Sequence, residues 1–188
     1  MRRIRYSVAM SLDGYIAGPN GESDWILMDP EIDFGALMNS FDTILMGRRT
    51  FEAAQSGGGG GSMQGMKAIV VSRTLRQEDY PDITIIGEDL EASLARLRGE
   101  PGKDIWLFGG GQLLNSLLDA GLVETVELAV MPVLLGGGIP LLSTPAKRAS
   151  LKLTAHKIYK TGIVALEYDV QKGARAAAAK RAKAAPKG

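Results

Sequence analysis

The stretch Asp104-Ile105-Trp106-Leu107-Phe108-Gly109-Gly110-Gly111-Gln112-Leu113-Leu114 decides the fold, because an apolar strand leads directly into three glycines and then a helix. This order leaves bare backbone N–H groups and a positive helix end where an anionic ligand can sit. A side chain there would hold a phosphate away from the main chain, and glycine alone tolerates the required dihedrals. The spacing is not the Rossmann G-x-G-x-x-G, since Leu114 occupies the third glycine position. The stretch indicates a nucleotide without saying which one, and a turn with no ligand is the competing interpretation.

Outward from this stretch, strand-like and helix-like segments alternate along the chain. Short apolar runs predict strands, and apolar residues at helical spacing predict helices between them. The predicted strands are 4–11, 43–46, 67–72, 83–86, the run from 104, 123–130 and 163–170, and further helices are predicted after 47, over 90–98 and over 112–120. Because no helix separates the last two strands, the pattern predicts an α/β fold with an antiparallel edge.

The first helix is predicted to begin at Asp29, which is a plausible N-cap with Pro30 in the first turn. Five apolar residues then follow at helical spacing: Ile32, Phe34, Leu37, Met38 and Phe41. A glycine-rich stretch from Ser56 to Ser62 is expected to be a flexible surface loop.

Composition restricts the class of protein. With 45% apolar and 23% charged residues, the 188-residue chain suits one globular domain, and no apolar run approaches the ~20 residues of a membrane span. No signal peptide is predicted behind Met1, so a cytoplasmic protein is expected. The absence of cysteine excludes disulfides and thiolate metal sites. Because His156 is the single histidine, no histidine metal cluster is expected, and we predict it to be an edge residue between strands.

The charge is uneven along the chain. Residues 172–188 carry six Lys or Arg and no acid, while the rest of the chain is mildly acidic. We therefore expect a domain over residues 1–171 and a flexible basic tail over 172–188. An acidic body is a poor surface for nucleic acid, so no specific nucleic-acid partner is expected.

Four motifs in order carry a family resemblance. They are Ser11-Leu12-Asp13-Gly14-Tyr15-Ile16-Ala17-Gly18, Ser23-Asp24-Trp25-Ile26, Met46-Gly47-Arg48-Arg49-Thr50-Phe51-Glu52 and Phe108-Gly109-Gly110-Gly111-Gln112. The chain resembles the dihydrofolate reductase superfamily, and the first two motifs resemble its riboflavin-biosynthesis reductase branch. The segment Pro132 to Leu142 is similar to the same stretch in small members of that branch. The resemblance implies a three-layer fold with a mixed, mostly parallel sheet, helices on both faces and an antiparallel edge.

The resemblance also implies NADPH as the cofactor. The family's residues for the adenosine half correspond to Gly47, Arg48, Arg49, Thr50, Ser72 and Arg73. Those for the pyrophosphate and nicotinamide correspond to Gly109, Gly110, Gly111, Gln112 and Leu113, and backbone groups of Ala9 and Ile16 would hold the carboxamide. In the family the first glycine pair is joined by a cis peptide. Two arginines on a ribose 2′-phosphate would favour NADPH over NADH by roughly a hundredfold. Surface ion pairs are the alternative role for these arginines.

The proton donor is predicted less directly. Dihydrofolate reductase places an acid early on the first helix, where this chain has Glu31 and Asp33, and Asp33 is the preferred candidate. An acid in the first turn also stabilises a helix through its dipole, and an ordered water is an alternative donor. Ser23, Trp25 and Phe34 are the predicted neighbours of the substrate, with Trp25 in the core as the alternative.

The substrate is expected to differ from that of the riboflavin branch. Ser7, Met38 and Gln55 stand where those enzymes carry a lysine, an arginine and an acid, so a ribosyl phosphate would lose its anchors. The resemblance then implies an NADPH-dependent reductase of an unphosphorylated pyrimidine, pterin or other carbonyl compound. A catalytically silent nucleotide-binding module of the same fold is the alternative function. Members of the branch commonly dimerise, so a homodimer is also expected.

Overall fold

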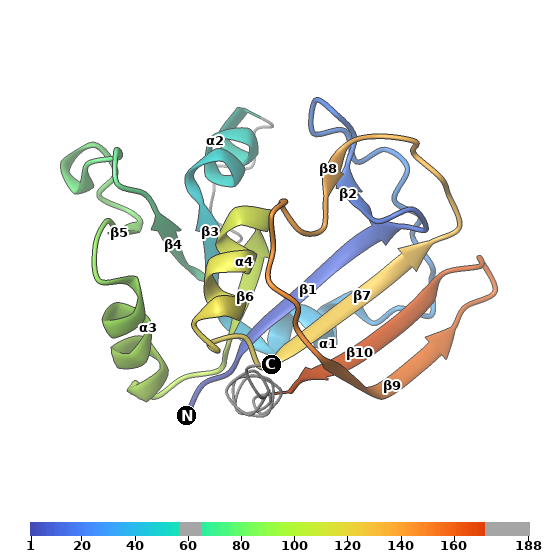
Figure 1. Cartoon of the computed structure of the whole chain (residues 1–188). Helices are drawn as coiled ribbons and strands as arrows, with labels where there is room; N and C mark the ends of the chain where they lie inside the picture. Colours follow the sequence, from blue (N-terminus) through green and yellow to red (C-terminus); the bar gives the residue numbers. More distant parts are fainter. Residues whose placement is uncertain (57–64, 172–188) are drawn as a thin grey trace, which may run out of the picture.

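The computed structural model describes residues 1–56 and 65–171, and its centre is one large twisted sheet (Figure 1). Eight strands follow the order β5-β4-β3-β6-β1-β7-β10-β9. Their bounds are β1 Ile4–Ser11, β3 Phe41–Gly47, β4 Lys67–Val71, β5 Thr84–Ile86, β6 Asp104–Gly109, β7 Thr125–Met131, β9 Leu151–Ile158 and β10 Val164–Val170. A separate pair is formed by β2 (Tyr15–Ala17) and β8 (Ile139–Pro140).

The neighbouring strands from β5 to β7 are parallel, whereas β10 is antiparallel to both β7 and β9. This confirms the predicted mostly parallel sheet with an antiparallel edge. The parallel strands end on the same side of the sheet, and ligands of α/β folds bind at that side.

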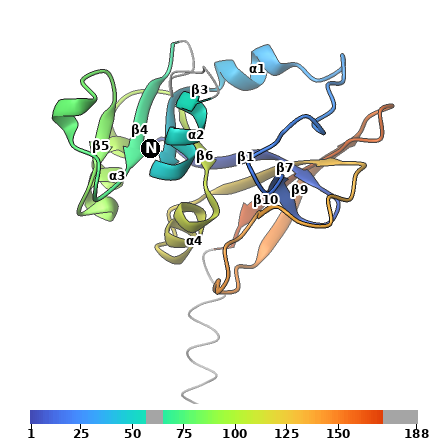
Figure 2. The same ribbon diagram turned by 90° about the horizontal axis from the view of Figure 1, so that it is seen from above.

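Helices cover both faces, which completes three layers (Figure 2). The helices are α1 (Phe34–Asn39), α2 (Arg48–Ser56), α3 (Leu90–Gly99) and α4 (Gly111–Asp119), with a single 3₁₀ turn η1 (Gln77–Asp79). Leucines of α3 and α4 pack in one core cluster, and Phe51 of α2 with partly buried residues of α1 packs in the other. Each fully buried Val, Leu, Ile, Phe or Met side chain contributes roughly 1.5–3 kcal/mol, so the two clusters hold the layers together.

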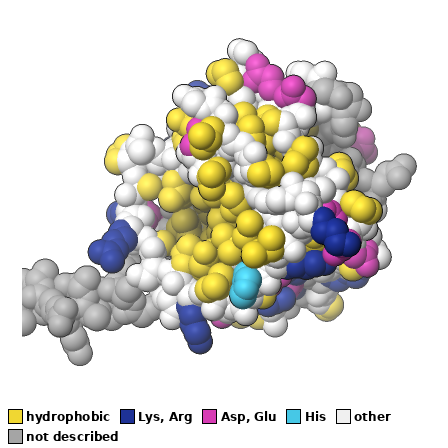
Figure 3. Space-filling model, turned by 90° about the vertical axis from the view of Figure 1, so that its right-hand side faces the viewer, with side chains coloured by type: hydrophobic (Ala, Val, Ile, Leu, Met, Phe, Trp, Pro, Cys, Tyr) yellow, Lys and Arg dark blue, Asp and Glu magenta, His cyan; other side chains and the backbone are white. Residues whose placement is uncertain are grey.

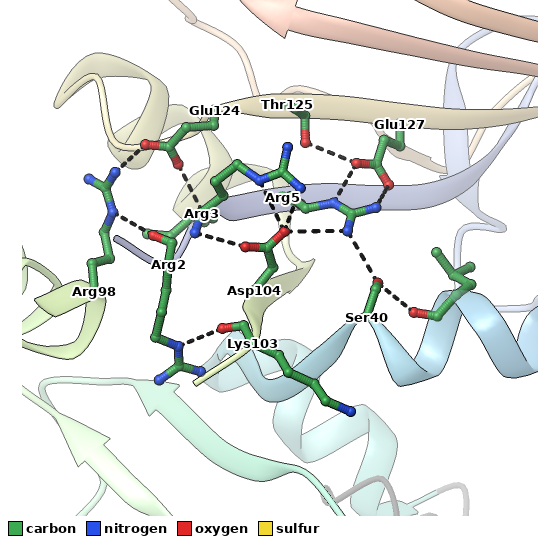
Figure 4. Close-up of polar contacts among 12 residues, drawn as sticks. Arg2, Arg3, Arg5, Ser40, Arg98, Lys103, Asp104, Glu124, Thr125 and Glu127 are labelled. Atoms are coloured by element: carbon green, nitrogen blue, oxygen red, sulfur yellow. Dashed lines mark hydrogen bonds and ion pairs between the residues drawn. The ribbon is translucent and has the colours of Figure 1, made fainter. Parts of the chain in front are cut away.

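Charged residues link the strands at the opposite end of the sheet, where β1, β6 and β7 begin (Figure 4). Arg5 makes two hydrogen bonds to Glu127, at 2.7 and 2.9 Å, and its guanidinium lies 4.7 Å from the ring centroid of Phe41. Arg3 donates to Asp104 at 2.7 Å. Burial alone would raise the pKa of the Asp104 carboxyl, but the hydrogen bonds and charge of Arg3 outweigh it and lower that pKa.

The first helix begins later than predicted, so the expected N-cap at Asp29 is wrong. The Asp29 carboxylate instead accepts hydrogen bonds from the Glu31 N–H at 2.8 Å and from the Thr161 hydroxyl at 2.7 Å. The chain makes a turn over this segment, and Asp33 caps α1 by accepting from Ala36 N–H at 2.8 Å. Phe41, predicted as the last apolar residue of the helix, is buried in β3.

Other boundaries also differ from the predictions. His156 lies inside β9 rather than between strands, and Ser56 belongs to α2 rather than to a loop. The rest of the predicted loop, 57–62, and the predicted tail, 172–188, lie outside the described residues. Within the described part of the chain, no helix is long and apolar enough to cross a membrane.

Candidate nucleotide-binding site

The candidate site lies where β1 separates from β6. The two strands pair only from Ile4↔Ile105 to Tyr6↔Leu107, while β1 continues beside β7 as far as Ser11↔Met131. The last part of β1 therefore has a neighbouring strand on one side only. This leaves an opening in the sheet between the C-terminal halves of β1 and β6.

Backbone groups of Ala9 face this opening. The carbonyl of Arg3 accepts from Ile105 N–H of β6, whereas the carbonyl of Ile4 accepts from Glu124 N–H on the β7 side. The backbone N–H and C=O groups of odd-numbered residues of β1 therefore point toward β6. The carbonyl of Ser7 is satisfied by the indole N–H of Trp106 at 2.8 Å. Ala9 is the next odd residue and lies beyond the last pair with β6, so its N–H and C=O are available to a ligand amide.

Ile16 has a similar arrangement on β2. Its neighbours Tyr15 and Ala17 pair with β8, so the backbone groups of Ile16 point away from that strand. Ala9, just before the first motif, and Ile16, within that motif, thus both carry outward-facing backbone groups, as a carboxamide-binding role requires.

Three glycines and a threonine meet beside the opening. The Gly109–Gly110 peptide bond is cis, as the family resemblance implies. Side-chain atoms at Gly110 would come 3.3 Å from Thr50 Oγ1 in the first turn of α2. Gly47, at the end of β3, lies next to the same peptide, with 3.9 Å from its Cβ position to Gly110 N. These predicted residues, from two separate motifs, are therefore brought together.

Two helix N-termini frame this glycine cluster. α2 begins at Arg48 and α4 at Gly111, each directly after a strand that ends at the site. In α4 the first intrahelical bond is from Leu114 N–H to Gly110 O, which leaves the N–H groups of Gly111, Gln112 and Leu113 ahead of it. Gly111 has no room for a side chain, because a Cβ there would lie 2.9 Å from Ser143 Oγ.

The predicted adenosine residues lie on adjacent strand ends. Gly47 is in register with Val71, so the turn that starts with Arg48 lies beside the turn that starts with Ser72. Arg48 pairs with Glu52 at 2.9 Å, whereas Arg49 and Arg73 are exposed and make no ion pair among the described residues. The buried Ser72 hydroxyl accepts from the N–H groups of Thr74 and Leu75, so it shapes its own turn.

The two candidate acids each have a local partner. Asp33 is exposed and caps α1. Glu31 lies outside the helix, and its carboxylate is 3.6 Å from the ammonium groups of Lys157 and Lys160. Each acid therefore has a structural role, Asp33 as a helix cap and Glu31 as a partner of two lysines. Neither carboxylate is buried.

The predicted substrate neighbours lie in the loop before α1 and at the first residue of that helix. Trp25 is half-buried and donates its indole N–H to Glu22 O at 3.0 Å, and Ser23 is exposed in the same turn. Phe34, the first residue of α1, keeps 37% of its surface exposed. Both rings therefore remain accessible in part, and neither is a core residue.

Sequence reasoning missed two carboxylates that anchor the loops around the site. Asp13 accepts from the Ser11 hydroxyl at 2.6 Å and from the N–H groups of Leu135 and Gly136, so the first motif is joined to the segment Pro132 to Leu142. These hydrogen bonds lower the pKa of Asp13. Asp29 joins its loop to the β9–β10 turn, and hydrogen bonds from Glu31 and Thr161 lower its pKa. The presence of both segments in one chain was the only sequence signal for the contact of Asp13 with Leu135 and Gly136.

An aromatic row also lies on the α1 face and was not predicted. Phe41 stacks on Trp106 at 5.6 Å between centroids, and Trp106 meets Phe108 edge to face at 5.1 Å. Phe108 is half-buried and directly precedes the cis glycine pair. A half-exposed ring at this point can stack on a planar ligand.

Within residues 1–56 and 65–171, no group of three or more His, Asp or Glu residues is placed to hold a metal ion.

Comparison with known proteins identifies a family and a fold. Residues 2–165 match the family described as RibD C-terminal domain. The uncharacterised protein YyaP of Bacillus subtilis (strain 168) is 35% identical over 178 residues, covering 89% of this chain and 94% of YyaP. Two solved structures show the same fold.

The first is a putative riboflavin biosynthesis protein from Shewanella sp. PV-4, with a TM-score of 0.75, 24% identity, and coverage of 92% of this chain and 100% of that one. The second is a dihydrofolate reductase from Enterococcus faecalis complexed with NADP(H), with a TM-score of 0.61, 17% identity, and coverage of 89% and 94%. The predicted dihydrofolate reductase-like fold is therefore confirmed.

Proposed function

The chain belongs to the RibD C-terminal domain family, and on that basis we propose that it is an NADPH-dependent reductase of a small heterocyclic or carbonyl compound. The observation that carries the proposal is the opening between β1 and β6, bordered by the Gly47–Gly110 cluster and two helix N-termini. When bound, NADPH supplies the hydride, and the chain's own residues bind and orient it.

We propose that the nicotinamide lies in the opening. The backbone N–H and C=O of Ala9 have no strand partner there, and a carboxamide has the matching acceptor and donor. Ile16 would contribute a second backbone contact. Thr50 and the Gly109–Gly110 peptide form the adjoining wall, where the pyrophosphate would meet the free N–H groups at the start of α4.

Arginines would select the phosphorylated cofactor. Arg49 and Arg73 are exposed on neighbouring turns, without ion pairs among the described residues, and so are available to a 2′-phosphate. Arg48 would have to exchange its Glu52 contact for the phosphate. That exposed pair is worth only about 0.3–0.5 kcal/mol, so a phosphate is a strong enough competitor.

The acceptor would be a planar, uncharged ring. Phe108 and Phe34 offer partly exposed aromatic surfaces, and Trp25 and Ser23 lie in the loop before α1. Ser7 occupies the face of β1 next to Trp106, where a phosphorylated substrate of the riboflavin branch would need a cation. An unphosphorylated pyrimidine or pterin therefore fits these side chains best.

For the proton, Asp33 remains our proposed donor, with Glu31 as the second candidate. Because asparagine caps a helix about as well as aspartate, Asp33→Asn removes the titratable proton and keeps α1 intact. We expect this variant to lose roughly 10²- to 10⁴-fold in kcat with its melting temperature unchanged. Glu31→Gln tests the second candidate in the same assay: loss of kcat in this variant alone would assign the donor to Glu31, which otherwise contacts two exposed lysines.

A catalytically silent nucleotide-binding module is the second candidate function. It is favoured by the local structural partners of both acids. An absorbance assay of NADPH oxidation distinguishes the two functions. The purified full chain is tested with a panel of pterin, pyrimidine and quinone-like acceptors. Turnover with any acceptor supports the reductase, whereas saturable NADPH binding without turnover, together with an Asp33→Asn variant that behaves like wild type, supports the module.

A further inference from the structure

The chain from residue 19 to residue 36, which leads from β2 into α1, contains a single buried residue, and that residue is charged. Asp29 keeps only 4% of its surface exposed, whereas its apolar neighbours Leu27 and Met28 keep 42% and 67%. This reverses the usual order, because burying a carboxylate is costly and burying leucine or methionine is favourable. The burial of Asp29 therefore indicates a specific role for its carboxylate.

Both oxygens of this carboxylate have partners. Oδ1 accepts from Glu31 N–H at 2.8 Å, within the same segment. Oδ2 accepts from the Thr161 hydroxyl at 2.7 Å and from Thr161 N–H at 3.4 Å. Hydrogen bonds to an ionised acceptor are among the stronger ones in proteins, so they compensate the buried charge. Asp29 thus fastens the middle of the segment to the β9–β10 turn.

The β9–β10 turn is a firm anchor for this contact. Tyr159 N–H donates to Ile163 O at 2.9 Å, and Gly162 N–H donates to Tyr159 O at 3.0 Å, so backbone bonds close the turn. The Cβ position of Gly162 lies 3.3 Å from Pro132 Cγ, and Ile163 is fully buried. Thr161 is therefore held by the sheet and not by the segment that it binds.

The segment has few other attachments to the protein. Among the described residues, the remaining polar contacts of residues 19–32 with distant residues are the ion pairs of Glu31 with Lys157 and Lys160, both at 3.6 Å. Figure 3 faces this side of the molecule and shows basic and acidic side chains next to one another beside an apolar area. Exposed ion pairs of this kind contribute little to stability. Most of the attachment therefore comes from the buried Asp29 carboxylate.

We propose that Asp29 is a positioning residue for the acceptor, a role that rests on the proposed reductase function. It lies four residues after Trp25 and five before Phe34, two of the predicted substrate neighbours. Holding the segment at Asp29 restricts both rings before the acceptor binds. Such pre-ordering lowers the entropy cost of binding, so acceptor affinity depends on the contact with Thr161. The proposed NADPH contacts come from other segments and are independent of it.

Thr161→Val tests the proposal, because valine keeps the branched shape and lacks the hydroxyl donor. Thr161→Ser keeps the hydroxyl and should restore wild-type behaviour. Thr154→Val is the matched control, since Thr154 of β9 donates to Glu167 O at 3.0 Å within the hairpin. The full-length variants and wild type are compared in NADPH oxidation, with the pterin, pyrimidine or quinone-like acceptor that wild type reduces fastest.

The Michaelis constant for the acceptor is the decisive readout. In Thr161→Val this KM should rise about tenfold or more, with kcat within about threefold of wild type and the Kd for NADPH unchanged. A purely structural role would lower the amount of folded enzyme, and hence the apparent kcat, without moving KM. A KM that is unchanged in Thr161→Val, or raised equally in Thr154→Val, overturns the proposal.

Amide hydrogen exchange of the ligand-free chain separates this proposal from the reductase function. Ile26 N–H donates to Ser23 O at 3.1 Å and Ile32 N–H donates to Asp29 O at 3.0 Å, so both report on the segment. Their exchange should be about 10- to 100-fold faster in Thr161→Val than in wild type or Thr161→Ser. Unchanged exchange overturns the anchoring itself. Faster exchange in a chain that reduces no acceptor means that the reductase function fails, and the positioning role with it, while the anchor stands.

Discussion

Gly47→Ala tests whether a ligand phosphate lies against the main chain where β3 meets α2. The protein itself has room for the methyl group, because the nearest atoms to a Cβ at Gly47 are Gly110 N at 3.9 Å and Gly109 O at 4.0 Å. Those are ordinary van der Waals distances. The variant should therefore fold normally and gain about 0.4–1 kcal/mol from the lower entropy of its unfolded chain.

Cofactor binding should respond in the opposite direction. A methyl group at this turn would keep a phosphate oxygen from one backbone N–H, and a charge-assisted hydrogen bond is worth about 1.5–3 kcal/mol. The dissociation constant for NADPH should rise about 10- to 150-fold in a calorimetric titration.

Gly99→Ala is the matched control. A Cβ at Gly99, the last residue of α3, meets no atom within 4 Å. This variant should bind NADPH as wild type does. If Gly47→Ala also binds NADPH with wild-type affinity while remaining folded, no phosphate approaches that turn and the placement of the cofactor is refuted.

Three further outcomes follow from the same structure. Arg73→Ala should weaken NADPH about tenfold or more and leave NADH nearly unchanged in parallel titrations; equal losses would contradict a 2′-phosphate contact. Gly138→Ala should lower the unfolding free energy by more than about 2 kcal/mol in denaturant titration, because its φ is +147° and a Cβ would overlap the carbonyl oxygen of Ala17. Asp104 has a lowered pKa in the folded state, so its contribution to stability is present above the unfolded value of about 3.9 and is lost as the pH falls through the folded value. Unfolding measured from pH 6 down to about pH 2 should therefore show a smaller acid loss in Asp104→Asn than in wild type, and identical slopes would contradict the assignment.

Local patterns predicted the parts of the fold whose signals lie close together in sequence. The apolar run into Gly109–Gly111 and the helix after it were found because strand, glycines and helix are contiguous. The antiparallel edge was predicted correctly, but β9 was missed. Its residues are exposed on both faces, so there was no continuous apolar run to mark the strand.

Long-range contacts could not be read from the sequence. The start of α1 was misplaced because Asp29 resembles an N-cap, while its partner Thr161 lies 132 positions away. Asp13 was noted as a motif residue, but its bonds to Leu135 and Gly136 exist only in the folded chain. The opening beside Ala9 similarly depends on where β1 leaves β6, and strand pairing cannot be read from either strand alone.

Amide chemical shifts of the full chain on addition of NADPH test the central claim most directly, because the proposed contacts are backbone groups. The account predicts saturable shifts concentrated at Ala9, Ile16, Gly47, Gly110 and the first residues of α4, larger for NADPH than for NADH at the Ser72–Arg73 turn. An unchanged spectrum, or shifts confined to another surface, would contradict a dinucleotide site between β1 and β6.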